Sequence, residues 1–289
     1  MYISNLSNNE KNKKIILVDN YLNNNFNYEI SRKIKNENKL SIIIEPRPHY
    51  RLKTVINNIL FFLGEDWDLL FIGSEVSINY LNNILPDLDC HLEYLNIDNL
   101  NPVEYSKILM DKNLLEKYNY ENIFVFQTDS ILIKKFNNDI LNYNYIGAPD
   151  YSNFNDNSYH LIYNGGISFR KRSFMLYCLN NINIDLINSF RKKKNDEING
   201  NNIRFFSEDN LVEDFYYSNC LSIINHNEVI DLEINNYFGQ LDKFLNIDKL
   251  ITIHAFDKVI NTEGREFITF DNLSKILKLS TYQKNLGKS

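Results

Sequence analysis

Two kinds of hydrophobic pattern alternate along the first half of the chain. Unbroken apolar runs are typical of strands buried on both faces of a parallel sheet. Between them, apolar residues recur three and four positions apart, as on one face of a helix. The expected strands are 14–19, 41–44, 68–73 and 123–126, and the expected helices are 51–63, 77–85 and 102–118. Strands that alternate with helices through about residue 130 indicate an α/β fold with a parallel sheet.

The pattern after residue 130 is less regular and favours an α+β arrangement of the second half. A charged segment at 188–202 contains the run Arg-Lys-Lys-Lys and is expected to be a solvated loop. The other expected elements are a glycine turn that leads into a strand within 163–169, helices at 173–180 and 207–218, and strands at 221–224 and 250–254.

Length and composition fit a globular protein with one large α/β domain or two small ones. Of the 289 residues, 44% are hydrophobic and 24% are charged, which is ordinary for such proteins. No apolar stretch reaches the ~20 residues that span a bilayer, and the polar N-terminus is unlike a signal peptide. Cys90, Cys178 and Cys220 lack metal-type spacing and are expected as core residues in a reducing compartment. We therefore expect a cytoplasmic protein without a transmembrane segment.

The net charge of −6 disfavours two classes of partner. Proteins that bind nucleic acids usually carry a basic excess that neutralises phosphates. Docking on an anionic membrane also requires basic clusters. Neither nucleic acid nor a membrane surface is therefore expected as a partner.

The most informative segment is Gln127-Thr128-Asp129-Ser130, which directly follows the buried run 123–126. Burying an unpaired charge is costly, so Asp129 is not explained by packing. Ligands of open α/β sheets bind outside the carboxyl ends of strands, and Asp129 is expected to face that crevice. There it could hold a divalent metal, while its three neighbours supply hydrogen bonds to a phosphate or a ribose. The alternative is an Asp that only caps a turn.

Two further segments carry candidate binding and catalytic groups. The glycines of Asn164-Gly165-Gly166 would let the backbone approach a ligand closely, or they form a plain hairpin turn. Glu208 and Asp209 open an expected helix, where the helix dipole favours negative charge. One of the two could act as a general base on an attacking hydroxyl. Ordinary helix-start electrostatics is the alternative interpretation.

Charged side chains also follow two other strand ends. His254 ends an expected strand and Lys258 lies four residues later, which offers an imidazole to a metal and an ammonium to a phosphate. Glu45 and Arg47 follow the first central strand in a loop with two prolines. Arg47 could pair with a phosphate or a base, and Glu45 could accept a hydrogen bond from a base or a ribose. A structural histidine and a surface salt bridge are the alternatives.

Taken together, these segments resemble glycosyltransferases of the GT-A fold, which use a nucleotide-diphospho-sugar donor. More narrowly, they are similar to a sparsely characterised glycosyltransferase-like family formerly described as a domain of unknown function. The shared pattern is Ile-Glu-Pro-Arg-Pro-His (44–49), Phe-Phe-Leu-Gly-Glu-Asp-Trp (61–67), Phe-Gln-Thr-Asp-Ser (126–130), Tyr-Ile-Gly-Ala-Pro (145–149), Asn-Gly-Gly-Ile-Ser-Phe-Arg (164–170), Glu-Asp (208–209) and a late His254. It covers about residues 41–260 in order.

The resemblance implies a GT-A-like, Rossmann-related α/β/α sandwich with a mostly parallel central sheet. It also implies that Asp129 and His254 hold Mn²⁺ or Mg²⁺ bridged to the donor diphosphate. The segment 164–166 would line the donor-sugar and acceptor pocket. Asp209, or else Glu208, would be the acceptor-activating base of an inverting enzyme.

One departure from the family pattern is Gln127, which stands where the first acid of the Asp-x-Asp metal motif would be. An amide in this place implies either a weaker metal site or a ribose held by the amide.

We therefore expect a glycosyltransferase that moves a sugar from a nucleotide-diphospho-sugar to a hydroxyl of a glycan or glycoconjugate. Residues 1–40 would extend a domain at 41–289, with a nucleotide-binding half (41–130) and an acceptor-binding half (131–270). One alternative is a non-catalytic binder of the same fold. The other is a nucleotidyltransferase, which normally has a glycine-rich, basic loop after its first strand.

Overall fold

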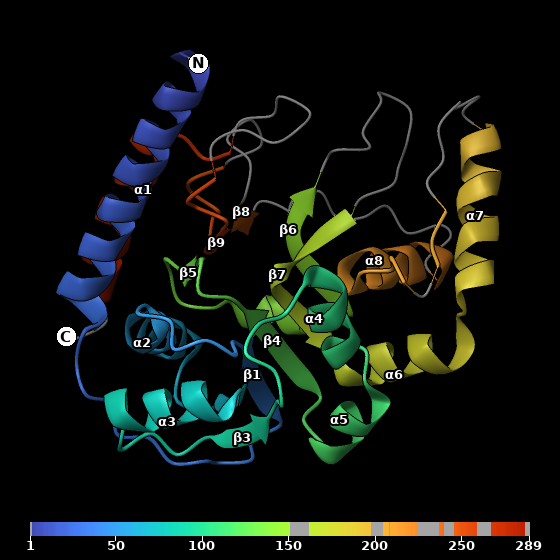
Figure 1. Ribbon diagram of the computed structural model, residues 1–289, viewed down its shortest axis with the longest axis horizontal. Helices are drawn as coiled ribbons and strands as arrows, with labels where there is room; N and C mark the ends of the chain where they lie inside the picture. Colours follow the sequence, from blue (N-terminus) through green and yellow to red (C-terminus); the bar gives the residue numbers. More distant parts are fainter. Residues whose placement is uncertain are drawn as a thin grey trace.

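The chain folds around a six-stranded sheet with the order β3-β2-β1-β4-β7-β6 (Figure 1). The computed structural model describes residues 2–150, 162–197, 205–207, 209–224, 237–239, 246–258 and 267–286. The six strands are β1 (Lys39–Ile44), β2 (Asp68–Gly73), β3 (His91–Tyr94), β4 (Asn122–Phe126), β6 (Tyr145–Asp150) and β7 (Ile162–Lys171). Strands β1 to β4 run parallel, and β7 is antiparallel to both of its neighbours. The structure is a mixed α/β fold with a mostly parallel central sheet, consistent with the expected GT-A-like, Rossmann-related architecture.

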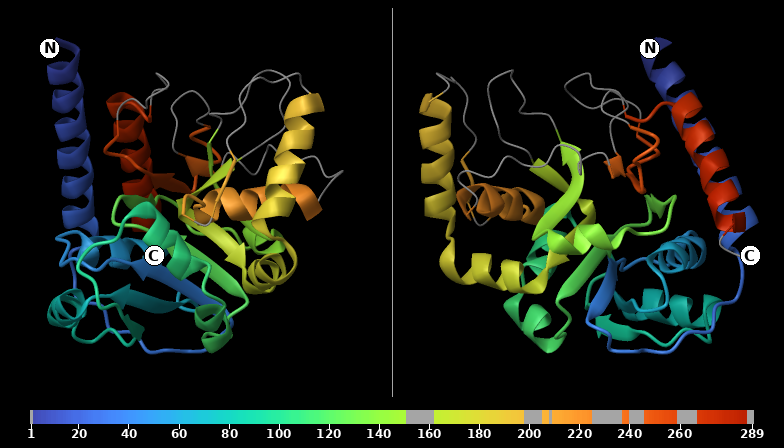
Figure 2. Two further views of the ribbon diagram at one scale, coloured as in Figure 1. Left: turned by 45° about the vertical axis from the view of Figure 1, so that its right-hand side comes forward. Right: turned by 180° about the vertical axis from the view of Figure 1, so that it is seen from behind.

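Helices flank this sheet, with α2 and α3 on one side and α5, α6 and α8 on the other (Figures 1 and 2). The α-helices are α1 (Tyr2–Phe26), α2 (Leu52–Leu63), α3 (Glu75–Ile84), α4 (Pro102–Leu109), α5 (Lys112–Lys117), α6 (Arg172–Asn181), α7 (Ile184–Glu197), α8 (Glu213–Ile224) and α10 (Phe270–Leu286), with a 3-10 helix at Asn138–Asn142. None of the described helices is long and apolar enough to cross a membrane.

The central strands are unbroken apolar runs because both of their faces are covered. Every residue of β2 and β4 is buried. Trp67 packs edge-to-face on Phe124 and Phe136, with ring centroids 6.1 and 5.5 Å away. The strands expected at 41–44, 68–73 and 123–126 are confirmed.

A second, three-stranded sheet has the order β5-β9-β8. Its strands are β5 (Ser130–Leu132), β9 (Thr252–His254) and β8 (Phe238–Gly239). Strands β5 and β9 are antiparallel, and Ser130 lies opposite His254. The expected strand near 250–254 is confirmed, and its pairing carries His254 to the segment that follows β4.

One edge of the main sheet gathers the segments that carry the candidate site residues. The parallel strands β1, β2 and β4 all present their carboxyl ends there. Strand β7 runs the other way, so its first residues reach the same edge, and Ile167 lies opposite Phe126. The segments 127–130 and 164–166 are therefore neighbours at the position where open α/β sheets bind ligands.

The strand expected at 14–19 is wrong, because these residues lie in α1. The buried side chains Lys14, Val18, Tyr21 and Leu22 recur at helical spacing. Helix α1 packs beside α2 and α10, and Tyr21 Oη lies 2.6 Å from Ser280 Oγ (Figure 2). A short apolar run fits a strand or a buried turn of helix equally well, and packing against α2 and α10 favours the helix at 14–19.

Three expectations for the second half are also wrong. The charged segment 188–202 is helical as far as Glu197, because Ile187 and Phe190 bury one face of α7. The residues expected as a strand at 221–224 are the last turn of α8. The helix expected from residue 207 begins only at Glu213.

Candidate active site

A cleft of about 600 Å³ opens at the carboxyl edge of the sheet. Its walls come from the loop after β1, the start of α4, the turn after β4, the first part of β7, the start of α8 and the loop after β9. The expected site residues that line it are Glu45, Arg47, Gln127, Thr128, Asp129, Asn164, Gly165, Gly166, His254 and Lys258. Ser130, also expected there, is fully buried and donates a hydrogen bond to Gly166 O at 2.9 Å.

The turn after β4 brings Asp129 against the end of β9. The backbone N–H of Ser130 donates to Gln127 O at 3.0 Å and closes this turn, while Ala255 N–H donates to Asp129 O at 3.0 Å. The imidazole Nε2 of His254 then lies 3.4 Å from Asp129 Oδ1 and 3.3 Å from Gln127 Oε1. The expected convergence of Asp129 and His254 is present, and their role as metal ligands stays a prediction.

The donor atoms around Asp129 suit a divalent cation. Among the described residues, the buried Asp129 Oδ1 accepts no hydrogen bond. Burial raises the pKa of Asp129, but the charges of His254 and Lys258 outweigh burial, so the pKa lies below its usual range and the carboxyl is ionised at neutral pH. Carboxylate oxygen, amide oxygen and imidazole nitrogen are all ligands of Mg²⁺ or Mn²⁺. The described residues contain no group of three His, Cys, Asp or Glu side chains that could hold a metal.

Gly165 and Gly166 lie inside β7, so they do not form a hairpin turn. A Cβ on Gly166 would lie 2.2 Å from His254 Nε2, and a Cβ on Gly165 would lie 2.1 Å from Glu213 Oε1. Asn164 Oδ1 accepts from Gly166 N–H at 2.9 Å and fixes the segment. The glycines therefore allow close approach of the strand to the cleft's side chains.

Glu45 and Arg47 form a self-contained pair in the loop after β1. The buried Glu45 carboxylate accepts from Arg47 Nε at 2.7 Å, from Arg47 Nη2 at 3.0 Å and from Arg47 N–H at 3.1 Å. The loop is tied to the start of α3, because the N-cap residue Ser74 donates from its Oγ to Pro46 O at 2.6 Å. Both residues line the cleft, with the guanidinium on its more exposed side.

Lys258 lines the cleft from a tight turn that follows β9. Ala255 has a left-handed backbone (φ 55°), which is unusual for a residue with a Cβ. Lys258 N–H donates to Ala255 O at 3.1 Å, and Lys258 O accepts from Lys14 Nζ of α1 at 2.9 Å. This hydrogen bond connects helix α1 to the loop after β9 that carries Lys258.

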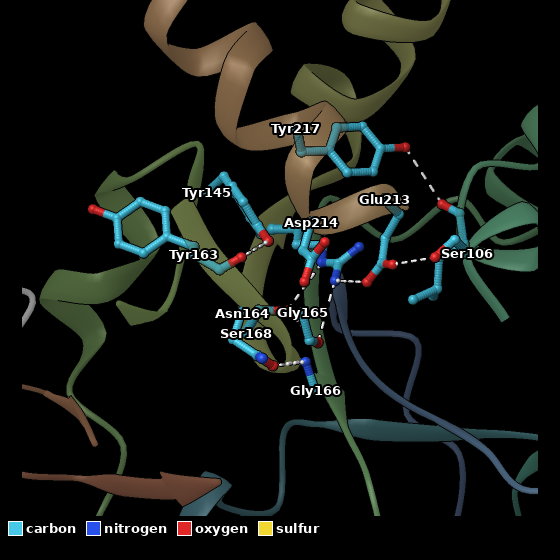
Figure 3. A network of polar contacts seen from close by, with 12 residues as sticks. Ser106, Tyr145, Tyr163, Asn164, Gly165, Gly166, Ser168, Glu213, Asp214 and Tyr217 are labelled. Carbon is cyan, nitrogen blue, oxygen red and sulfur yellow. Dashed lines mark hydrogen bonds and ion pairs between the residues drawn. The ribbon is translucent and has the colours of Figure 1, made fainter. Parts of the chain in front are cut away.

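Two acids at the start of α8 also line the cleft (Figure 3). Glu213 is buried, and its oxygens take a 3.0 Å ion pair from Arg170 and a 2.6 Å hydrogen bond from Ser106. The half-buried Asp214 carboxylate accepts from the N–H groups of Phe215 and Gly165. Burial, together with the charge of Glu213, raises the pKa of Asp214 to about 7.

Asp209, the first choice among the predicted bases, does not line this cleft. Asp209 is exposed in the turn before α8 and is not among the residues that line the cleft, and Glu208 lies outside the described residues. The sequence reasoning missed Glu213 and Asp214. The signal was available, because the dipeptide Glu-Asp recurs at 213–214, directly before the aromatic run 215–217 that is partly buried in the helix.

The family model described as a protein of unknown function (DUF5672) matches residues 89–240, just over half of the chain. The chain belongs to this family. The match includes the turn with Asp129, the glycines of β7 and the acids of α8, whereas His254 lies beyond it. No curated protein matches the chain.

Among solved structures, the chain is similar to the mannosyltransferase PcManGT from Pyrobaculum calidifontis, solved in complex with GDP-Man and Mn²⁺. The identity is 10%, the TM-score is 0.34, and the match covers 58% of each chain. The chain thus aligns with little more than half of that enzyme's length, and a likeness at this level says nothing about what the chain itself binds.

Proposed function

We propose that this protein is a metal-dependent glycosyltransferase that moves a sugar from a nucleotide-diphospho-sugar to a hydroxyl acceptor. The observation that carries the proposal is the meeting of Asp129, His254 and Gln127 at the carboxyl edge of the sheet. Although Gln127 and His254 are 127 positions apart in the sequence, their side chains lie 3.3 Å apart, beside the ionised carboxylate of Asp129, whose Oδ1 accepts no hydrogen bond from the described residues. Such convergence is unnecessary for packing and suits a bound cation with its phosphates.

Asp129 and His254 would hold Mn²⁺ or Mg²⁺, and Gln127 would add a neutral amide oxygen. When bound, such a cation neutralises the charge that grows on the departing diphosphate. Lys258 supplies a further positive charge on the same wall of the cleft, and Arg47 supplies one at the loop after β1. Both side chains would bind phosphate oxygens of the donor.

The glycine segment 164–166 forms the floor on which the donor sugar would rest. Absence of Cβ atoms leaves the backbone within reach of a flat pyranose ring, and Asn164 would hydrogen-bond to its hydroxyl groups. The acceptor would enter beside α8, on the side of Asp214.

We assign the base to Asp214 in place of Asp209, because Asp214 lines the cleft and Asp209 does not. In the reaction, Asp214 takes the proton of the acceptor hydroxyl as the acceptor oxygen bonds to the anomeric carbon. The bond from that carbon to the phosphate oxygen breaks, and the nucleoside diphosphate leaves with the electron pair. Attack from the face opposite the leaving group inverts the anomeric carbon.

Calorimetry and turnover assays with a panel of uridine, guanosine and thymidine diphospho-sugars, with and without Mn²⁺, test the proposal. We expect one donor to bind only with the metal and to release its nucleoside diphosphate in a metal-dependent reaction. Binding of a donor without any turnover would instead support the non-catalytic binder. Metal-dependent release of pyrophosphate from a nucleoside triphosphate would support a nucleotidyltransferase.

A further inference from the structure

Adjacent acids at the start of α8 differ in the kind of partners they have. Both oxygens of Glu213 are engaged, one by Arg170 Nη2 at 3.0 Å and the other by Ser106 Oγ at 2.6 Å. Asp214 faces Gly165 and the cleft, and the described groups that donate to it are backbone N–H groups (Figure 3). Glu213 is thus neutralised by a side-chain cation, whereas the described partners of Asp214 carry no charge.

Arg170 is the group that creates this difference. Its side chain is fully buried, and its guanidinium lies 5.3 and 5.7 Å from the ring centroids of Tyr145 and Tyr217. It also donates to Ser168 Oγ at 3.0 Å and to Gly165 O at 3.3 Å. A buried guanidinium with these contacts is costly unless a carboxylate faces it, so Glu213 is held in place by a strong constraint.

We propose that Arg170 is a positioning residue of the transferase. It ties the floor of the donor pocket at Gly165 to the start of α8, and it pairs with Glu213 so that Asp214 alone meets the acceptor. This inference rests on the proposed function and adds a residue that touches neither donor nor acceptor. The Cβ clash expected at Gly165 with Glu213 Oε1, at 2.1 Å, indicates how closely the three parts are fitted.

The charges around Asp214 should shift its pKa, an effect that packing contacts alone would not produce. The ionisable groups that act electrostatically on Asp214 are Glu213 on α8, Arg170 on β7 and Tyr145 on β6. Tyr105 and Tyr217 act on the neighbouring Glu213, and Asp129, His254 and Lys258 line the same cleft. The negative charge of Glu213 raises the pKa of Asp214, and the positive charge of Arg170 lowers it. Removal of the Glu213 charge should therefore lower the pKa of Asp214, and removal of the Arg170 charge should raise it.

The test is a titration followed by NMR on protein labelled with ¹³C at the aspartate carboxyl groups. The signal of Asp214 is assigned by its loss in Asp214→Asn. We expect Glu213→Gln to lower the midpoint by about one unit and Arg170→Met to raise it by a similar amount. The double variant should return close to the wild-type midpoint, since the two charge effects cancel.

Glu213→Gln keeps the shape of the side chain, so it reports even if Arg170→Met fails to fold. An unchanged midpoint in Glu213→Gln, or shifts of the same sign in both folded single variants, would overturn the proposal. The titration does not depend on enzyme turnover, so it tests the role of Arg170 separately from the glycosyltransferase activity. If no donor reacts with the wild-type protein while Glu213→Gln still lowers the midpoint, the glycosyltransferase assignment fails and the Arg170 pairing stands.

Discussion

A single methyl group on Gly166 should disable the proposed cation site. The Cβ of Gly166→Ala would lie 2.2 Å from His254 Nε2 and 2.8 Å from Gln127 Oε1. Ordinary contact needs about 3.5 Å, so the imidazole must retreat by about 1 Å. The strain of such overpacking costs about 1–3 kcal/mol of stability. A displacement of about 1 Å in a reacting constellation costs about 100-fold in rate.

Gly165→Ala is the matched control, because it adds the same methyl group one residue earlier in the same strand. The three atoms nearest to its Cβ would belong to Glu213 and Arg170, with Glu213 Oε1 at 2.1 Å, and none of them to His254. The assay is calorimetry of a nucleoside diphosphate with and without Mn²⁺, alongside thermal unfolding of both variants. We expect Gly166→Ala to lose the effect of Mn²⁺ and Gly165→Ala to keep it. Equal metal dependence in the two variants would refute the placement of the cation at His254.

Three other predictions concern the charged groups of the cleft. Asp129→Asn should retain its circular dichroism spectrum but lose about 100-fold or more in metal-dependent transfer, and an Mn²⁺ titration of the rate checks this. Asp214→Asn should cost about 10²–10⁴-fold in kcat, whereas Asp209→Asn should match the wild-type protein in the same assay. A base must be deprotonated, and burial raises the pKa of Asp214 to about 7. The wild-type rate should therefore be lost as the pH falls through about 7. A pH–rate profile with Asp209→Asn as the control tests the midpoint.

The main sheet was predictable because its central strands are buried on both faces. Strands of this kind appear as unbroken apolar runs, and β2 at Asp68–Gly73 has the bounds that the pattern predicts. The helix at Leu52–Leu63 was equally clear, because its apolar residues keep helical spacing up to Gly64, whose φ of 102° ends it. Polar residues that follow such strands then pointed to the edge where the cleft opens.

Long-range pairing and helix starts were harder to predict. Nothing in the local sequence says that His254 pairs with Ser130, since that register belongs to a sheet built from distant segments. Both Glu-Asp dipeptides, at 208–209 and 213–214, precede apolar residues, so the sequence alone does not show which of them opens α8. In the structure the helix begins at Glu213, and Tyr216 and Tyr217 are buried in it. The glycines of β7 indicated that the backbone lies close to another group, but the sequence did not show that these groups are the side chains of Glu213 and His254.

Crystals soaked with Mn²⁺ and a nucleoside diphosphate provide the most direct measurement. Anomalous scattering from manganese locates the ion without any assumption about the ligand. The proposed function predicts one peak in the cleft, within about 2.3 Å of an Asp129 oxygen and of His254 Nε2. A nucleotide bound in the cleft without that peak, or a manganese ion held by other residues, would contradict it.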